Sequence, residues 1–287
     1  MCKIFLVINK NPAVNKTVSD LVTANITNLS SEQDGYSVFR NDTSFFYDTD
    51  LAYKNIGSNL SYKNEELYIV HTRTSTGGSE GVAGLHLQTL FKDWIYCHNG
   101  IVDKFSGVAK HSDSYYFFKH YLKKYKGKVT PETINDHSQD TGFSGKGILY
   151  NKKTKDLYWF CNVAGQITIL ADCIILSNYD IETKKKEYQI KSVLGYQWYE
   201  EYKEVEISGI VHQSSIDNTY LHFKDGLLID QAKFENKSYG QTGYYNGGMM
   251  GEDYEFENGV YKRKSKKEKS FYQDKEEQVI NQLKVLE

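Results

Sequence analysis

The sequence has no long apolar run, only two prolines and only four cysteines among its 287 residues. No segment approaches the roughly 20 consecutive apolar residues that cross a bilayer, and the apolar stretch at 4–8 is too short for the core of a signal peptide. The cysteines stand far apart, without a disulfide framework or metal-ligand spacing, at Cys2, Cys97, Cys161 and Cys173. We therefore expect a cytoplasmic protein with reduced thiols, no metal and no other cofactor.

Net charge is also nearly absent. A balance of −2 is too small to indicate a nucleic-acid or polyanion binder over the whole surface. The composition instead favours a globular protein rich in sheet, because 14% of the residues are aromatic and 24 are tyrosine. A chain of this length can bury a sizeable core, as one large domain or two small ones.

Apolar periodicity predicts many strands and few helices. Strands are expected at 4–8, 36–40, 43–47, 66–72, 94–98, 143–150, 156–163, 166–171 and 174–178, and less clearly between 188 and 231. Helices are expected over 17–29 and 114–125, and Pro131 suits the first turn of another. The dipeptide Asn99-Gly100 is the strongest short hairpin signal in the chain.

The composition changes near residue 232. Residues 240–251 are rich in glycine, tyrosine and asparagine, residues 262–269 form a basic run, and residues 274–286 have the spacing of a short amphipathic helix. The basic run fits a solvated linker better than a nucleic-acid patch. We predict a domain over 1–231 and a tail over 232–287 that docks on a partner.

Cys2 becomes the amino terminus if Met1 is removed, and a start methionine is commonly removed before a small side chain. The residue would then carry a thiol and an α-amine with unperturbed pKa values of about 8.5 and about 7.7–8.0. The amine could serve as general base for its own thiol. Alternatively, Cys2 is an ordinary small apolar residue at the start of a strand.

Five short motifs occur in an order that carries more information than any one of them. They are Cys2 itself, Asp34-Gly35-Tyr36, His71-Thr72-Arg73-Thr74-Ser75-Thr76-Gly77, His98-Asn99-Gly100-Ile101-Val102 and Ser112-Asp113-Ser114. This series resembles the glutaminase domain of class II glutamine amidotransferases, which are amino-terminal-nucleophile (Ntn) hydrolases. The resemblance covers about residues 1–171 and implies an α+β fold, a four-layer α/β/β/α sandwich of two mainly antiparallel sheets.

The resemblance also implies an activity and a role for each matching residue. Cys2 would attack the side-chain amide of L-glutamine, release ammonia and form a thioester that water hydrolyses to glutamate. The side-chain amide of Asn99 and the backbone N–H of Gly100 would stabilise the oxyanion. The substrate would be held by Arg73 at its carboxylate, by Asp113 at its ammonium and by Thr76. In isolation, Arg73 fits an exposed arginine at a strand end, Asn99-Gly100 fits a hairpin turn and Asp113 fits a helix cap.

Three features depart from the family pattern. Thr74 stands where an aromatic residue usually follows the arginine, and Ser177-Asn178 stands where a serine-aspartate pair is common. The segment after Asp180 is too short for a synthase domain, so we expect this chain to lack one. The chain would act as a stand-alone glutaminase, or as the glutaminase subunit of a separate synthase. Two alternatives stay open, namely an Ntn hydrolase of another amide and a catalytically idle interaction protein. If the partner is not a synthase, we expect the chain to associate with a second copy of itself through the tail.

Overall fold

The computed structural model describes residues 2–26, 34–48, 59–74, 81–106, 110–179, 181, 183–193, 196–207, 209–210, 212–234, 254–257 and 260–263. The chain divides into two units, Met1–Phe234 and Glu235–Glu287. In the second unit, the described residues form one antiparallel hairpin of β16 (Tyr254–Glu257) and β17 (Val260–Arg263). The helix expected over 274–286 lies outside the described residues.

The first unit contains a seven-stranded sheet in which every pairing is antiparallel. Its strand order is β13-β9-β10-β1-β4-β2-β3, which places β1 in the middle. The strands are β1 (Lys3–Asn9), β2 (Gly35–Arg40), β3 (Thr43–Asp48), β4 (Leu67–Arg73), β9 (Gly165–Leu170), β10 (Cys173–Ser177) and β13 (His212–Ile216). The strand that begins beside Cys2 is thus held by a neighbour on each side.

A second sheet of the same unit has six strands in the order β15-β14-β8-β7-β6-β5, again all antiparallel. They are β5 (Thr89–Leu90), β6 (Trp94–Val102), β7 (Phe143–Asn151), β8 (Asp156–Cys161), β14 (Thr219–Lys224) and β15 (Leu227–Lys233). A separate hairpin joins β11 (Lys184–Val193) to β12 (Tyr196–Glu206).

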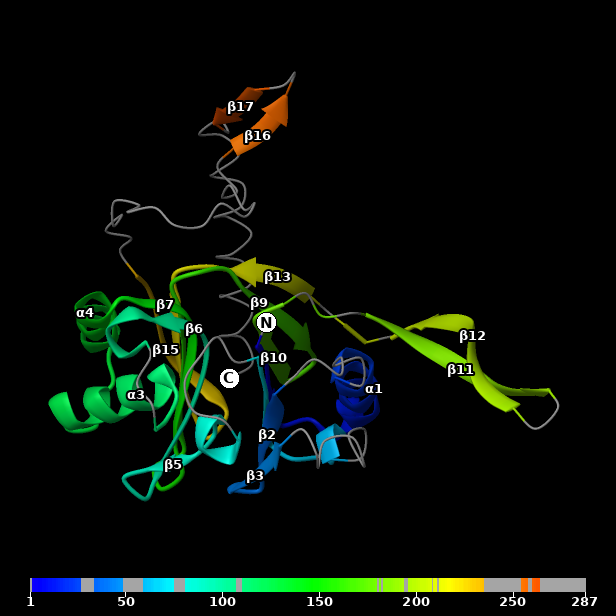
Figure 1. Ribbon diagram of the computed structural model, residues 1–287, viewed down its shortest axis with the longest axis horizontal. Helices are drawn as coiled ribbons and strands as arrows, with labels where there is room; N and C mark the ends of the chain where they lie inside the picture. The colour runs from blue at the N-terminus through cyan, green and yellow to red at the C-terminus, as the bar shows by residue number, and fades with distance from the viewer. Residues whose placement is uncertain are drawn as a thin grey trace. The chain divides into compact units, whose positions relative to one another are not determined.

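Helices cover the outer faces of both sheets, which gives the predicted α/β/β/α order of layers (Figure 1). Helix α1 (Asn15–Ile26) packs Val18, Leu21 and Val22 in one core with Phe5 and Val7 of β1. Helices α3 (Asp113–Lys124) and α4 (Pro131–Thr141) share a second core with β6, β7 and β8. The α+β sandwich is confirmed. Among the described residues, no helix has both the length and the apolar composition to span a membrane.

The alternation of side chains along β1 explains why this strand reads as continuously apolar. Phe5 and Val7 face α1, so Ile4 and Leu6 face the other sheet. All four are at most 1% exposed, as expected for a strand between two covered layers. The start of β1 therefore lies at one end of the interface between the two sheets.

Capping residues set the ends of the helices near their predicted positions. Ser112 caps α3 by accepting the N–H of Tyr115, and Thr130 forms a capping box ahead of Pro131. Gly142 ends α4 with a left-handed φ of 65°. Helix α1 differs from its prediction, because it begins at Asn15, directly after a 3-10 turn over Pro12–Val14.

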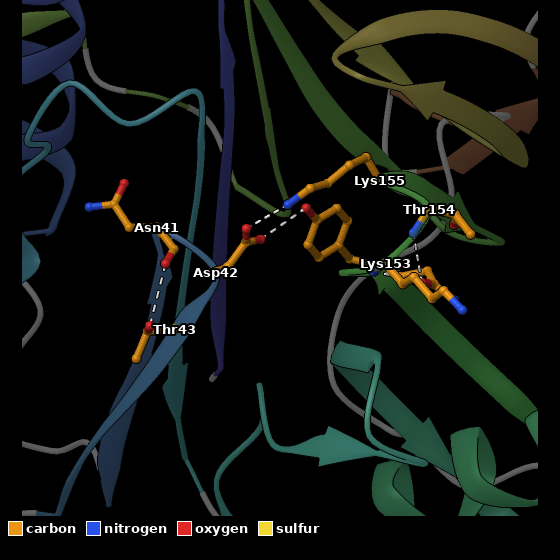
Figure 2. A network of polar contacts seen from close by, with 8 residues as sticks. Asn41, Asp42, Thr43, Lys153, Thr154 and Lys155 are labelled. Carbon is orange, nitrogen blue, oxygen red and sulfur yellow. Dashed lines mark hydrogen bonds and ion pairs between the residues drawn. The ribbon is translucent and has the colours of Figure 1, made fainter.

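At the opposite end of the sandwich, a polar network joins the two sheets (Figure 2). Asp42, in the turn between β2 and β3, forms an ion pair of 2.5 Å with Lys155 and accepts a hydrogen bond of 3.3 Å from the Tyr150 hydroxyl. A cavity of about 280 Å³ lies there, lined in part by Ile8 and Phe39. None of the predicted site residues that the structure describes lines this cavity.

Candidate active site

Cys2 contacts the backbone of Thr74, the residue that directly follows β4. Its thiol donates to the carbonyl of Thr74 with an Sγ–O distance of 3.4 Å, and the N–H of Thr74 donates to Sγ at 3.3 Å. Pairing of Lys3 with Thr72 across β1 and β4 fixes this arrangement. The same pairing places Arg73, the last residue of β4, within electrostatic reach of the thiol.

The Cys2 side chain is half-buried, and its thiol forms no disulfide. Burial raises the pKa of the thiol, and this rise is partly opposed by the hydrogen bond from Thr74 and the positive charge of Arg73. The protonated thiol therefore predominates near neutral pH. A nucleophile in this state needs a general base close to the sulfur.

The carbonyl of Cys2 is held by two carboxamides from different sheets. The Asn99 amide, on β6, donates to this oxygen at 2.7 Å, and the Asn178 amide, directly after β10, donates to it at 3.0 Å. Asn178 also accepts the N–H of Ile4 at 2.6 Å. Two of the predicted residues, Cys2 and Asn99, are thus brought into direct contact where the sheets meet.

Gly100 lies inside β6, so the predicted hairpin turn at Asn99-Gly100 is wrong. The strand continues to Val102, and Gly100 pairs with Gly145 of β7. A Cβ on Gly100 would lie 1.9 Å from the Ser144 carbonyl oxygen, and its φ of 151° is one that other residues rarely adopt. Glycine is required here for the close approach of two strands.

The two residues predicted to hold the substrate occupy different structural positions. Arg73 is 5% exposed at the end of β4. Asp113 is the first residue of α3, where it accepts the N–H of Val102 at 2.9 Å and that of Ser114 at 2.8 Å. The Ser114 hydroxyl donates a third hydrogen bond at 3.2 Å. An ionised carboxylate has about four acceptor positions, so these three bonds leave about one for an ammonium group. Thr76 lies outside the described residues.

Three histidines, His71, His86 and His98, are buried near the site, and the sequence alone assigns no role to them. The rings of His71 and His86 stack with centroids 3.9 Å apart, and His86 accepts the backbone N–H of His98 at Nδ1. Burial lowers the pKa of His71 to about 3 and that of His98 to about 4. All three rings are therefore neutral at pH 7, because the pKa of His86 is lowered by burial as well.

A short hydrogen-bonded chain leads from this cluster to the predicted ammonium-binding residue. The Ser114 hydroxyl donates to the Asp113 carboxylate at 3.2 Å and lies 2.8 Å from Nδ1 of His98. The Ser114 hydroxyl thus links His98 on β6 to the Asp113 carboxylate on α3.

Among the described residues, one group has the composition of a metal site. Ligand atoms of His71, His86 and Cys97 all lie within 4.8 Å of one another. The geometry does not fit an ion, because stacked imidazoles direct their nitrogens in parallel and Nδ1 of His86 already accepts a backbone hydrogen. Burial also raises the pKa of Cys97 well above its usual value, which disfavours the thiolate that a metal requires.

Two contacts of Cys2 carry no clear signal in the sequence. Thr74 acts through its backbone, so its side-chain identity gives no indication of the contact. Asn178 stands out only as a departure from the family pattern, 176 residues away from Cys2 in the chain. Only the pairing of β1 with β10 shows that the two are neighbours.

Comparison with known proteins identifies the fold. No protein-family model and no curated protein matches the sequence. A solved structure described as the allosteric regulatory enzyme of purine biosynthesis matches with a TM-score of 0.50 and 13% identity, over 82% of this chain and 49% of that one. At this identity the likeness shows a shared fold alone.

Two further solved structures resemble the chain more weakly. Glutamine phosphoribosylpyrophosphate amidotransferase from B. subtilis, in complex with ADP and GMP, matches with a TM-score of 0.49 and 14% identity, over 82% of this chain and 50% of that one. A protein from Pseudomonas aeruginosa PA01, described as a predicted glutamine amidotransferase, matches with a TM-score of 0.39 and 11% identity, over 79% of this chain and 95% of that one. This chain spans about half the length of the first two structures.

Proposed function

We propose that this chain hydrolyses the side-chain amide of L-glutamine, with Cys2 as nucleophile after removal of Met1. The observation that carries the proposal is the contact between Cys2, at the start of the central strand, and the Asn99 amide from the facing sheet. A thiol that would stand next to its own α-amine and beside a carboxamide donor has the parts that amide hydrolysis needs. The order of motifs along the sequence supports glutamine as the amide.

In this reaction, Sγ of Cys2 bonds to the amide carbon and its proton passes to the α-amine. The resulting oxyanion would accept hydrogen bonds from the Asn99 side chain and the Gly100 N–H. The C–N bond then breaks as the amine returns a proton to the nitrogen, and ammonia leaves a thioester on Cys2. Water attacks this thioester, which releases glutamate and restores the thiol.

The remaining site residues would select free glutamine. Arg73 suits bidentate capture of the α-carboxylate, since a guanidinium offers five N–H donors in a fixed fork. Asp113 would take the α-ammonium with the acceptor capacity that its bonds to Val102 and Ser114 leave open. Thr76 completes the proposed substrate-binding set.

We further propose that the ammonia passes to a separate synthase or is released by the chain acting alone. The tail over 232–287 is the proposed contact with that synthase or with a second copy of the chain.

The test combines intact mass with a glutamate assay. The mass of the purified protein should lack Met1, and glutamate should appear from glutamine. Cys2→Ala should abolish this release and the labelling of the protein by a glutamine-mimicking electrophile, whereas Cys161→Ala, at a buried thiol on β8, should keep both. A protein that retains methionine and gives no glutamate at high glutamine would contradict the proposal, and labelling that persists in Cys2→Ala would identify another thiol.

A further inference from the structure

Asn178 continues the pairing of β10 with β1 by means of its side chain. The last backbone pair between these strands is Phe5 with Ser177, and the next residue, Asn178, turns its carboxamide toward β1. There it accepts the N–H of Ile4 at 2.6 Å and donates to the carbonyl of Cys2 at 3.0 Å. One side chain thus fixes the backbone on both sides of Lys3, directly behind the proposed nucleophile.

The Asn99 amide is shared between two duties under the proposed function. It donates to the Cys2 carbonyl at 2.7 Å, yet it should also donate to an oxyanion formed at the Cys2 sulfur. A carboxamide has two N–H donors, but if Asn99 rotates to aim its amide at the oxyanion, its bond to the Cys2 carbonyl is weakened or lost. The second donor, Asn178, would keep that partly buried oxygen hydrogen-bonded and the strand end in place.

We propose that Asn178 is a positioning residue, which holds the Cys2 carbonyl so that Asn99 is released to stabilise the oxyanion. This inference rests on the proposed glutaminase reaction and adds a residue to it. Asn178 is also a neutral side chain that contacts the residue proposed to carry the α-amine. A carboxylate in the same place would favour the charged ammonium and so reduce the free amine that acts as base.

Two substitutions separate these effects. Asn178→Ala removes both hydrogen bonds, and we expect kcat to fall roughly ten- to a hundredfold with KM changed less than about twofold, because loss of alignment at the nucleophile acts on turnover. Asn178→Asp keeps the acceptor for Ile4, replaces the donor with a negative charge and should shift the acidic limb of the kcat/KM profile to higher pH.

Asn11 provides a matched control at the far end of β1. It also accepts one backbone N–H, from Ala13 at 2.9 Å, and donates to one backbone carbonyl, that of Ala171 at 3.3 Å. Asn11→Ala should leave kcat, KM and the pH profile unchanged. A merely structural role for Asn178 would lower the thermal midpoint without moving the pH profile in Asn178→Asp.

A second measurement does not depend on glutamine turnover. The rate at which iodoacetamide alkylates Cys2, followed by mass spectrometry between pH 6 and pH 9, reports the thiol and its neighbouring amine. Asn178→Ala and Asn178→Asp should shift this profile relative to the wild type and Asn11→Ala. Unchanged alkylation in both variants would overturn the role of Asn178 even if the wild type releases glutamate. If both Asn178 variants shift the alkylation profile but the wild type releases no glutamate, the proposed function is refuted and the positioning role of Asn178 is kept.

Discussion

At the scale of single residues, truncation of Arg73 and truncation of Asn99 to alanine should change different kinetic parameters. Arg73→Ala removes the proposed carboxylate contact, so it should raise KM more than it lowers kcat. Asn99→Ala removes a proposed transition-state donor and should lower kcat by about 10²–10³-fold with little change in KM. Steady-state kinetics of glutamate release, with Arg73→Lys as the variant that keeps the charge, distinguish the two. Equal effects on both parameters in the two variants would contradict the assignment.

The buried histidines make a second residue-scale prediction, which concerns stability and pH. His71 and His98 have folded pKa values of about 3 and about 4, below the unfolded value near 6.5. The unfolded state therefore binds more protons as the pH falls below about 6.5, so stability is fully present above that pH and is lost toward pH 4. Each histidine should contribute about 2 kcal/mol of this loss between pH 7 and pH 5.

Urea unfolding at pH 7 and pH 5 measures this loss directly. Substituting the exposed His120 with glutamine should leave the difference between the two midpoints unchanged. Identical midpoints at the two pH values in the wild type would show that the buried histidines do not resist protonation.

At the scale of elements, the junction of β6 and β7 depends on two facing glycines. A Cβ at position 100 would overlap the Ser144 carbonyl oxygen, which is backbone and cannot move aside. Gly100→Ala should therefore lower the free energy of unfolding by more than about 3 kcal/mol or prevent folding. Gly81 is the control, since it also has a positive φ, but a Cβ added there would have no described neighbour within 4 Å.

Thermal unfolding of the two variants checks this prediction. Gly81→Ala should cost only about 1–2 kcal/mol, the penalty of a left-handed backbone alone. Similar midpoints for Gly100→Ala and Gly81→Ala would show that the strand pairing tolerates a side chain at position 100.

Most strands and helices could be predicted because their signals are local. Ser112 and Thr130 precede helices that begin where the caps indicate. The signal at Asn99-Gly100 was misleading, because the same dipeptide suits both a hairpin turn and a glycine that faces another strand. Only the long-range pairing of β6 with β7 distinguishes the two, and that pairing is not encoded in a short window.

At the scale of the whole molecule, the order of the motifs predicted the sandwich and the position of Cys2. The sequence did not reveal the buried group of His71, His86 and Cys97, since these residues come from β4, a loop and β6. Cysteine spacing alone led to the expectation of no metal site, and that expectation stays a prediction. The contact of Asn178 with Cys2 depends likewise on strand order, which residue types do not specify.

The boundary of the first unit leads to a prediction about the tail. Strand β15 runs to Lys233, and Ala232 and Phe234 pack against the core beneath α3 and α4, beyond the predicted boundary at residue 231. A chain that ends after Phe234 keeps these contacts, whereas one that ends after Gln231 loses them. The first should retain the thermal midpoint of the full chain, and the second should melt at a lower temperature.

The same pair of truncations tests whether the tail binds a partner. Because the unit Met1–Phe234 contains every proposed catalytic residue, the chain ending after Phe234 should release glutamate at the full-length rate. Self-association, measured by sedimentation with the full chain as reference, should be lost if the tail joins two copies. Unchanged association together with full activity would exclude the tail as the contact between copies. A loss of activity in the chain ending after Phe234, with its thermal midpoint intact, would instead place part of the tail in the catalytic machinery.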